Sequence, residues 1–214
     1  VQTCALPILV CGSSQGLGLA SAIELSQLGA NVILMARNED RLQQALAKLD
    51  TLQNQQHHYL IADFTNPDHV KKSIDDFLLK GHKIHILVNN TGGPAAGTAI
   101  DAKTQDFTSA FQSHLLCNHL LVQAVTPGMK EANYGRIINI ISTSVLQPIA
   151  GLGVSNTIRA AVANWSKTLS IELGQFGITV NSVLPGFMQT VRAEYIIQKK
   201  AAETNKSEIG RAHV

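Results

Sequence analysis

Residues 10–18 of the chain read VCGSSQGLG, and this stretch decides the fold. An apolar run ends in three closely spaced glycines, and an amphipathic segment follows. This is the pattern of a strand that turns tightly into a helix whose N-terminus can receive a phosphate group. A glycine-rich turn also occurs in strand-to-helix connections that bind no ligand, so the turn alone leaves both readings open.

The composition favours one globular domain. The chain has 214 residues, of which 45% are hydrophobic and 15% charged, so it can bury a full core. Its formal net charge of +2, with Lys and Arg scattered, indicates neither a nucleic-acid partner nor a membrane surface. No apolar run approaches the roughly 20 residues of a membrane span, so we expect a cytoplasmic protein. Cys4, Cys11 and Cys117 have no metal-binding or disulfide spacing, and no metal site is expected.

The two ends of the chain look foreign to the rest. Residues 1–8 and 208–214 resemble the conceptual translation of a sequencing adaptor read from its two sides. Natural ends that match by chance at both termini are the alternative. We expect a single domain over residues 9–207, flanked by non-native tails that should be left out of fold reasoning.

Between these ends, strand patterns alternate with helix patterns. Short apolar runs predict strands at residues 9–11, Asn31–Ala36, 58–62, 84–88, 136–141 and Ile178–Val183. Amphipathic spacing predicts helices at residues 16–28, 39–49, Pro67–Leu79, 104–129 and 191–202, the fourth of which Thr126–Pro127 could bend. Apolar residues at 158, 162, 165, 169 and 173 predict one more helix. Continuous apolar strands separated by helices indicate an α/β fold: a Rossmann-type, doubly wound parallel sheet in a three-layer α/β/α arrangement.

Polar residues follow each of the six expected strands. They include the glycine turn itself, Arg37, Asp63, residues 89–93, Ser142 and residues 185–190. In a parallel sheet, ligands bind beyond the carboxyl ends of the strands, where the strand order reverses. Six such segments in register therefore predict a dinucleotide site rather than an empty turn.

Two of these strand-end segments resemble the motifs of a known family. The spacing Gly-x3-Gly-x-Gly at residues 12–18, with Cys11 in place of a threonine, and the segment Asn89-Asn90-Thr91-Gly92 are similar to motifs of the short-chain dehydrogenase/reductase family, including 3-oxoacyl-acyl-carrier-protein reductases. The resemblance covers residues 9–207. It implies cofactor-binding roles for Gly12, Ser13, Ser14, Gln15, Gly16, Leu17, Gly18, Arg37, Asp63, Asn90, Gly92, Pro185, Gly186 and Thr190.

The residue after the second strand favours NADP(H) over NAD(H). An acidic residue there would bind the ribose 2′-hydroxyl, whereas Arg37 would attract a 2′-phosphate. A surface arginine beside a helix is the alternative reading of Arg37. Because Gln15 adds no second positive charge, we expect the preference to be modest.

The catalytic positions depart from the family pattern. The resemblance implies a tetrad of Asn, Ser, Tyr and Lys, in which Tyr follows Ser by thirteen residues and Lys follows Tyr by four. Ser142 matches the serine, but Ser155 stands at the tyrosine position, Arg159 at the lysine position and His114 at the asparagine position. Loss of a general acid commonly costs about 10²–10⁴-fold in rate. A serine hydroxyl is a weaker acid than a phenol, and a guanidinium does not titrate.

Two functions remain open. In the first, the chain is an oxidoreductase that reduces a small carbonyl or 3-oxoacyl-like substrate: His114 supplies or relays the proton, Ser142 and Ser155 hold the carbonyl, and Arg159 anchors the cofactor. In the second, it is a catalytically impaired dinucleotide-binding homologue with a regulatory or structural role. The resemblance also implies a homodimer or homotetramer and a C-terminal truncation that removes a last strand.

Overall fold

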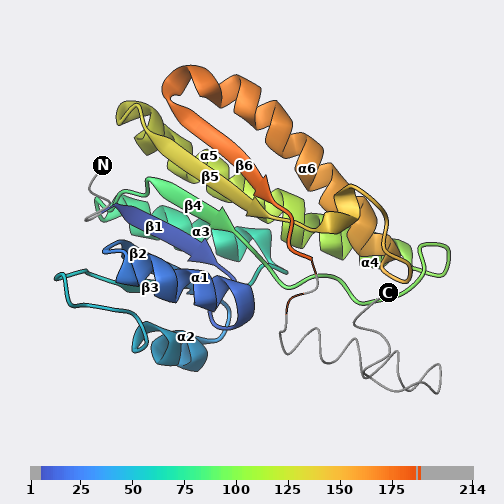
Figure 1. Ribbon diagram of the computed structural model, residues 1–214, viewed down its shortest axis with the longest axis horizontal. Coiled ribbons are helices and arrows are strands. Elements are labelled where there is room, and N and C mark those ends of the chain that lie inside the picture. The colour runs from blue at the N-terminus through green and yellow to red at the C-terminus, as the bar shows by residue number, and fades with distance from the viewer. Residues whose placement is uncertain (1–5, 187, 189–214) are drawn as a thin grey trace.

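The computed structural model describes residues 6–186 and 188. It contains a six-stranded parallel sheet in the order β3-β2-β1-β4-β5-β6 (Figure 1). The strands are β1 (Pro7–Cys11), β2 (Asn31–Ala36), β3 (His58–Ile61), β4 (Ile86–Asn89), β5 (Gly135–Ile140) and β6 (Ile178–Val183). The main helices are α1 (Gly16–Gln27), α2 (Glu39–Leu46), α3 (Pro67–Leu79), α4 (Thr104–Phe111), α5 (Cys117–Glu131) and α6 (Gly153–Leu173).

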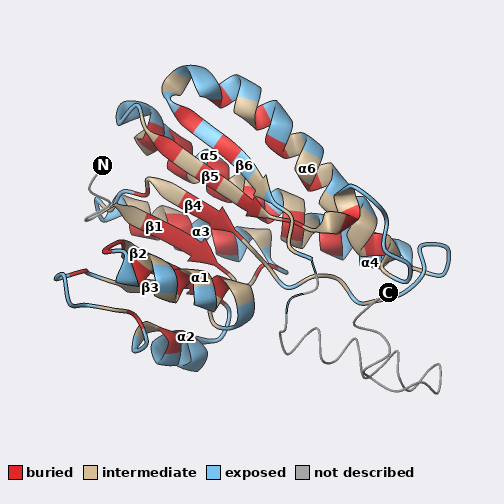
Figure 2. Ribbon diagram, in the orientation of Figure 1, coloured by how far each residue is buried: buried red, intermediate tan, exposed pale blue. Residues whose placement is uncertain are grey.

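Helices cover both faces of this sheet, as expected for the three-layer α/β/α fold. Successive side chains of a strand point to opposite faces. On β1, Leu9 and Cys11 therefore pack with α3, α5 and α6, while Ile8 and Val10 pack with α1 and α2. All four side chains are buried, and Figure 2 shows the buried central strands as a red band.

The expected elements are confirmed with small shifts at their ends. Strands β2 and β6 and helix α3 have the predicted bounds, and the apolar stripe from Ile158 to Leu173 lies on α6. Strand β1 starts at Pro7, two residues earlier than predicted, and pairs with β2 through Pro7 and Ile8. Helix α2 ends at Leu46 rather than at residue 49. The helix predicted at residues 191–202 lies outside the described residues.

The helical stretch predicted over residues 104–129 is confirmed, but a π-helical turn interrupts its regular α-helical pattern. Helix α4 is followed by a π-helical turn, Gln112–Leu116, and then by α5, which continues through Pro127. A π-turn adds one residue and so shifts the phase of the helix. Phe111 is left 40% exposed, whereas Ala110 and His114 are buried, so the predicted apolar stripe is broken at this turn.

The chain order reverses between β1 and β4. Strand β1 pairs with β2 on one side and with β4 on the other, so the loops after β1 and β4 leave the same edge in opposite directions. This is the switch point at which an open α/β sheet binds its ligand. Among the helices that the structure describes, none is long and apolar enough to cross a membrane.

Candidate cofactor and substrate site

The glycine turn after β1 is built from three glycines with different tasks. Gly12 and Gly16 both have φ of +58°, a region that other residues rarely adopt. At Gly18, a Cβ would lie 2.4 Å from the Gly12 carbonyl oxygen, so only glycine permits α1 to approach the turn. A Cβ at Gly12 would lie 2.7 Å from the Asn90 carbonyl oxygen, which explains the glycine there as well.

Two side chains hold this turn in place, one from the loop after β4 and one from the turn itself. The Asn90 Nδ2 donates to the carbonyl oxygens of Cys11 at 3.2 Å and Gly12 at 3.4 Å. The Ser13 hydroxyl accepts from the Met35 N–H at 2.9 Å, which extends the β1–β2 ladder beyond the end of β1. Ser13 is fully buried, so its side chain positions the turn.

The start of α1 fits a pyrophosphate. Gln15 is the N-cap residue, and its side chain does not cap the helix. A helix N-terminus carries unpaired N–H groups and a partial positive charge, both of which favour a phosphate. A Cβ at Gly16 or at Gly92 would meet no atom within 4 Å, so both glycines border open space. Of the other predicted residues, Ser14 and Leu17 complete this turn.

Arg37 and Asp63 follow β2 and β3, on the side of the switch point where the adenosine part of a dinucleotide would bind. Arg37 is exposed directly after β2. The Asp63 Oδ1 accepts the Thr65 N–H and the Thr65 hydroxyl, both at 2.9 Å. These hydrogen bonds, with smaller contributions from nearby Arg37 and His69, hold the pKa of Asp63 below its ordinary value. Asp63 is therefore a carboxylate acceptor at neutral pH.

Arg159 lies against the carboxyl end of β5, the strand that Ser142 follows, and Ser155 lies on the same helix as Arg159. Arg159 Nη1 donates to the Ile140 carbonyl oxygen at 2.8 Å, which fixes this side of α6 two residues before Ser142. Ser155 precedes Arg159 by four residues and so lies on the same face of α6. The Ser142 Oγ accepts the Ser144 N–H at 3.1 Å.

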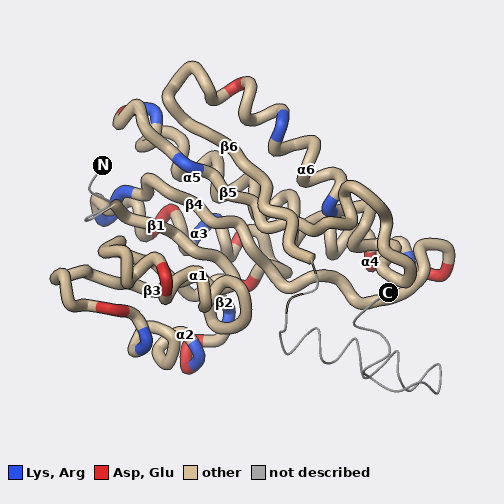
Figure 3. The backbone as a smooth tube through the Cα atoms, in the orientation of Figure 1, with Lys and Arg blue, Asp and Glu red and all other residues tan. Residues whose placement is uncertain are grey.

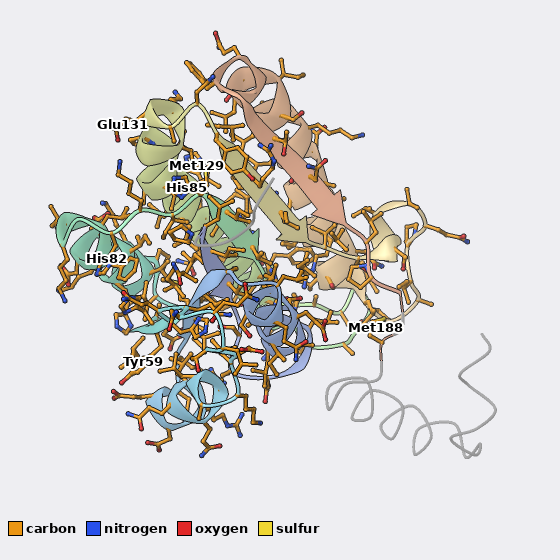
Figure 4. All side chains as sticks on the ribbon, turned by 60° about the vertical axis from the view of Figure 1, so that its left-hand side comes forward. Tyr59, His82, His85, Met129, Glu131 and Met188 are labelled. Carbon is orange, nitrogen blue, oxygen red and sulfur yellow. The ribbon has the colours of Figure 1, made fainter. Side chains whose placement is uncertain are left out.

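The segment after β6 joins the same edge. The Thr143 N–H donates to the Pro185 carbonyl oxygen at 3.2 Å, so Pro185 and Gly186 lie beside the Ser142 loop. Thr190, the last predicted cofactor residue, lies outside the described residues. Met188 beyond this contact is 49% exposed (Figure 4).

His114 occupies the middle of the π-turn and is 2% exposed. Single π-turns inside helices are frequent at functional sites. His114 lines a cleft of about 540 Å³ that runs beneath residues 92–98 and reaches Val154, the neighbour of Ser155. Ser142, Ser155 and Arg159 are not among its lining residues, so of the four expected catalytic residues only His114 lines this cleft.

A buried chain of polar side chains crosses the second half of the sheet and was not predicted. Asn89 Nδ2 donates to Asn139 Oδ1 at 2.8 Å, and Asn139 Nδ2 donates to Ser166 Oγ at 2.8 Å. All three side chains are at least 97% buried. The pattern that could have found them is Asn139 inside an otherwise apolar strand. These bonds fix β4 against β5 and α6, which supports the loops that carry Asn90 and Ser142.

Among the described residues, no group of three or more His, Cys, Asp or Glu side chains is placed to hold a metal ion. Burial raises the pKa of Cys117 to about 12 and also raises that of Cys11 well above its ordinary value. Both thiols therefore stay protonated within the core.

Comparison with known proteins agrees with this geometry. Residues 7–201 match the sequence profile of short chain dehydrogenases. The 3-oxoacyl-acyl-carrier-protein reductase of Rickettsia conorii is 32% identical over 192 residues, covering 90% of this chain and 76% of that protein. L-sorbose reductase from Gluconobacter frateurii, complexed with NADPH and L-sorbose, is similar with a TM-score of 0.89 at 26% identity, covering 98% of this chain and 81% of that one. NAD⁺-bound xylitol dehydrogenase has a TM-score of 0.84 at 25% identity, covering 92% and 76%.

The family profile extends over residues 7–201, and this span includes the glycine turn at the switch point, Asn90 and the segment after β5. The chain belongs to the short-chain dehydrogenase/reductase family of oxidoreductases, which act on alcohol and carbonyl groups.

Proposed function

We propose that the chain is an NADP(H)-dependent reductase of a small carbonyl or 3-oxoacyl-like compound. The observation that carries the proposal is the 2.8 Å bond from Arg159 to the Ile140 carbonyl oxygen. It sets the Ser155 face of α6 against the end of β5, beside Ser142 and on the edge that holds the glycine turn. A hydride donor and a carbonyl oxygen could therefore meet within one site.

Support for NADP(H) comes from the end of β2. Exposed Arg37 follows this strand, and a guanidinium binds a phosphate through paired N–H groups. The NADPH complex of L-sorbose reductase is a structural relative, although the NAD⁺-bound xylitol dehydrogenase is another. The choice between the two cofactors therefore depends on the local charge at Arg37.

The bound nicotinamide cofactor would supply the hydride. Ser142 and Ser155 would donate hydrogen bonds to the carbonyl oxygen, on which negative charge develops. His114 would provide or relay the proton, because histidine titrates nearest to neutral pH. Arg159 would stay cationic and hold α6 to β5, since a guanidinium does not release a proton in this pH range.

The test is NADPH oxidation by the full-length gene product with a panel of ketones and 3-oxoacyl thioesters. We expect turnover with at least one member, and a loss of about 10²-fold or more in His114→Gln with NADPH affinity retained. Tight NADPH binding without turnover on any substrate would overturn the reductase and favour the dinucleotide-binding alternative. Recovery of turnover in the double variant Ser155→Tyr, Arg159→Lys would then identify the missing proton donor as the cause.

We also propose where the enzyme is located, how its subunits assemble and which residues form the domain. We place the enzyme in the cytoplasm, as a homodimer or homotetramer of a single domain over residues 9–207, with non-native tails at 1–8 and 208–214. Exposed Phe111 and Leu116 around the π-turn support a subunit contact there. Light scattering of the full-length product tests the assembly, and resequencing of the gene tests the tails.

A further inference from the structure

The glycine turn and α2 are joined by a side-chain contact that the sequence does not suggest. Arg41 Nη1 donates to Gln15 Oε1 at 3.0 Å, and both residues are exposed. Gln15 is the N-cap residue of α1, and Arg41 lies in the first turns of α2, four residues after Arg37. The contact therefore brings a positive charge to a turn that has no cationic side chain of its own.

Both partners of this contact are held by rigid backbone. The Ser13 hydroxyl ties the turn to the Met35 N–H of β2 at 2.9 Å. Asn38 caps α2, because its Oδ1 accepts the Arg41 N–H at 2.8 Å. Since β2 leads through Arg37 and Asn38 directly into α2, Arg41 has a fixed place relative to the turn. The Gln15–Arg41 contact then selects one direction for a long, flexible side chain.

The acidic residues near Arg41 have other roles. Glu39 Oε1 accepts the hydroxyl of Tyr59 on β3 at 2.9 Å, and Figure 4 shows Tyr59 on the side of the sheet that faces α2. Asp40 lies in the first turn of α2, where a carboxylate is favoured by the helix dipole. Figure 3 shows charges of both signs around α2. In the sequence Arg37 directly follows β2 and Arg41 lies in the first turns of α2, so both cations lie on the segment that leaves this strand.

We propose that Arg41 is a second ligand of the cofactor 2′-phosphate, alongside Arg37, and that Gln15 is the residue that positions it. This rests on the proposed NADP(H) function. A guanidinium has five N–H donors in a planar fork, so Arg41 can bond Gln15 with one and a phosphate with others. Gln15 therefore contributes to the 2′-phosphate preference through Arg41, without a charge of its own.

The test compares binding of 2′,5′-ADP and 5′-AMP, which differ only in the 2′-phosphate, by calorimetry of the full chain. Loss of a charged hydrogen bond predicts that Arg41→Ala weakens 2′,5′-ADP by about 10-fold while 5′-AMP changes by less than about twofold. Gln15→Ala keeps the charge and is expected to weaken 2′,5′-ADP by about threefold. Gln15→Glu places a carboxylate beside the phosphate and is expected to weaken binding of 2′,5′-ADP most. Lys48→Ala, an exposed cation just beyond α2, is the matched control for net charge.

The outcomes separate this inference from the cofactor assignment. If Arg37→Ala lowers the preference for 2′,5′-ADP and Arg41→Ala does not, Arg41 is not a phosphate ligand, although NADP(H) use stands. Equal weakening of both nucleotides in Arg41→Ala, or an equal loss in Lys48→Ala, also overturns the inference. If the unchanged chain binds neither nucleotide, both the inference and the proposed function fail. Thermal melting of each variant confirms that it is folded.

Discussion

Replacing Gly18 by alanine tests how closely α1 packs against the glycine turn. The new Cβ would lie 2.4 Å from the Gly12 carbonyl oxygen and 2.9 Å from Asn90 Nδ2. Because non-bonded heavy atoms prefer about 3.5–4 Å, α1 must move by roughly 1 Å. Such overpacking costs about 1–3 kcal/mol. At about 2–4 °C for each kcal/mol in a domain of this size, we expect the melting temperature to fall by about 2–12 °C.

Two other glycines separate packing from ligand binding in this experiment. Gly128→Ala in α5 adds a Cβ that meets no atom within 4 Å, so it should leave stability unchanged or raise it by about 0.5–1 kcal/mol. Gly16→Ala also meets no atom, but its φ of +58° costs about 1–2 kcal/mol and its methyl would enter the pyrophosphate space. We expect Gly16→Ala and Gly18→Ala to lose NADPH affinity and Gly128→Ala to keep it. If the melting temperature of Gly18→Ala equals that of the wild type, this reasoning is refuted.

Three further outcomes are expected. Asn90→Asp should melt below Asn90→Ala in thermal denaturation at pH 7, because a carboxylate would face two carbonyl oxygens that the amide now bonds. Burial lowers the pKa of His58 and His85, so the unfolded chain takes up protons at a higher pH than the folded chain does. The free energy of unfolding should therefore fall as the pH drops below about 7. In melting curves at several pH values, the double variant His58→Gln, His85→Gln should lose less stability in acid than the wild type. With Cys4 replaced by serine, native protein should resist thiol alkylation at pH 7, since the pKa of buried Cys117 is raised to about 12, and rapid labelling without unfolding would contradict this.

Much of the fold follows from patterns that act over short distances in the sequence. Within β2, the run Val32–Ala36 is apolar and buried throughout, and a strand buried on both faces requires that composition. Helix α3 begins at Pro67, which suits a first helical turn, with Asn66 as its cap. The switch point followed from strand order, which obeys general rules of chain connection.

The parts that sequence reasoning missed depend on partners far away in the chain. The Arg41–Gln15 contact spans 26 residues, and neither residue type indicates the other. The role of Asn139 depends on its hydrogen bonds to Asn89 and Ser166, which lie on other elements. The π-turn at His114 has no periodic pattern, because an inserted residue interrupts the period on which helix prediction relies.

The bond from Asn90 to Cys11 has a consequence for how the protein is made. The two residues lie 79 positions apart, so the glycine turn leaves the ribosome long before its partner. At about 5–20 residues per second, the first strand waits several seconds for β4 to emerge. During that time its apolar side chains lack the neighbour on one side, and a nucleotide has no finished pocket to enter. Cofactor binding should therefore begin only once the second half of the sheet has been synthesised. Until then, the exposed apolar side chains of the first strand should bind chaperones.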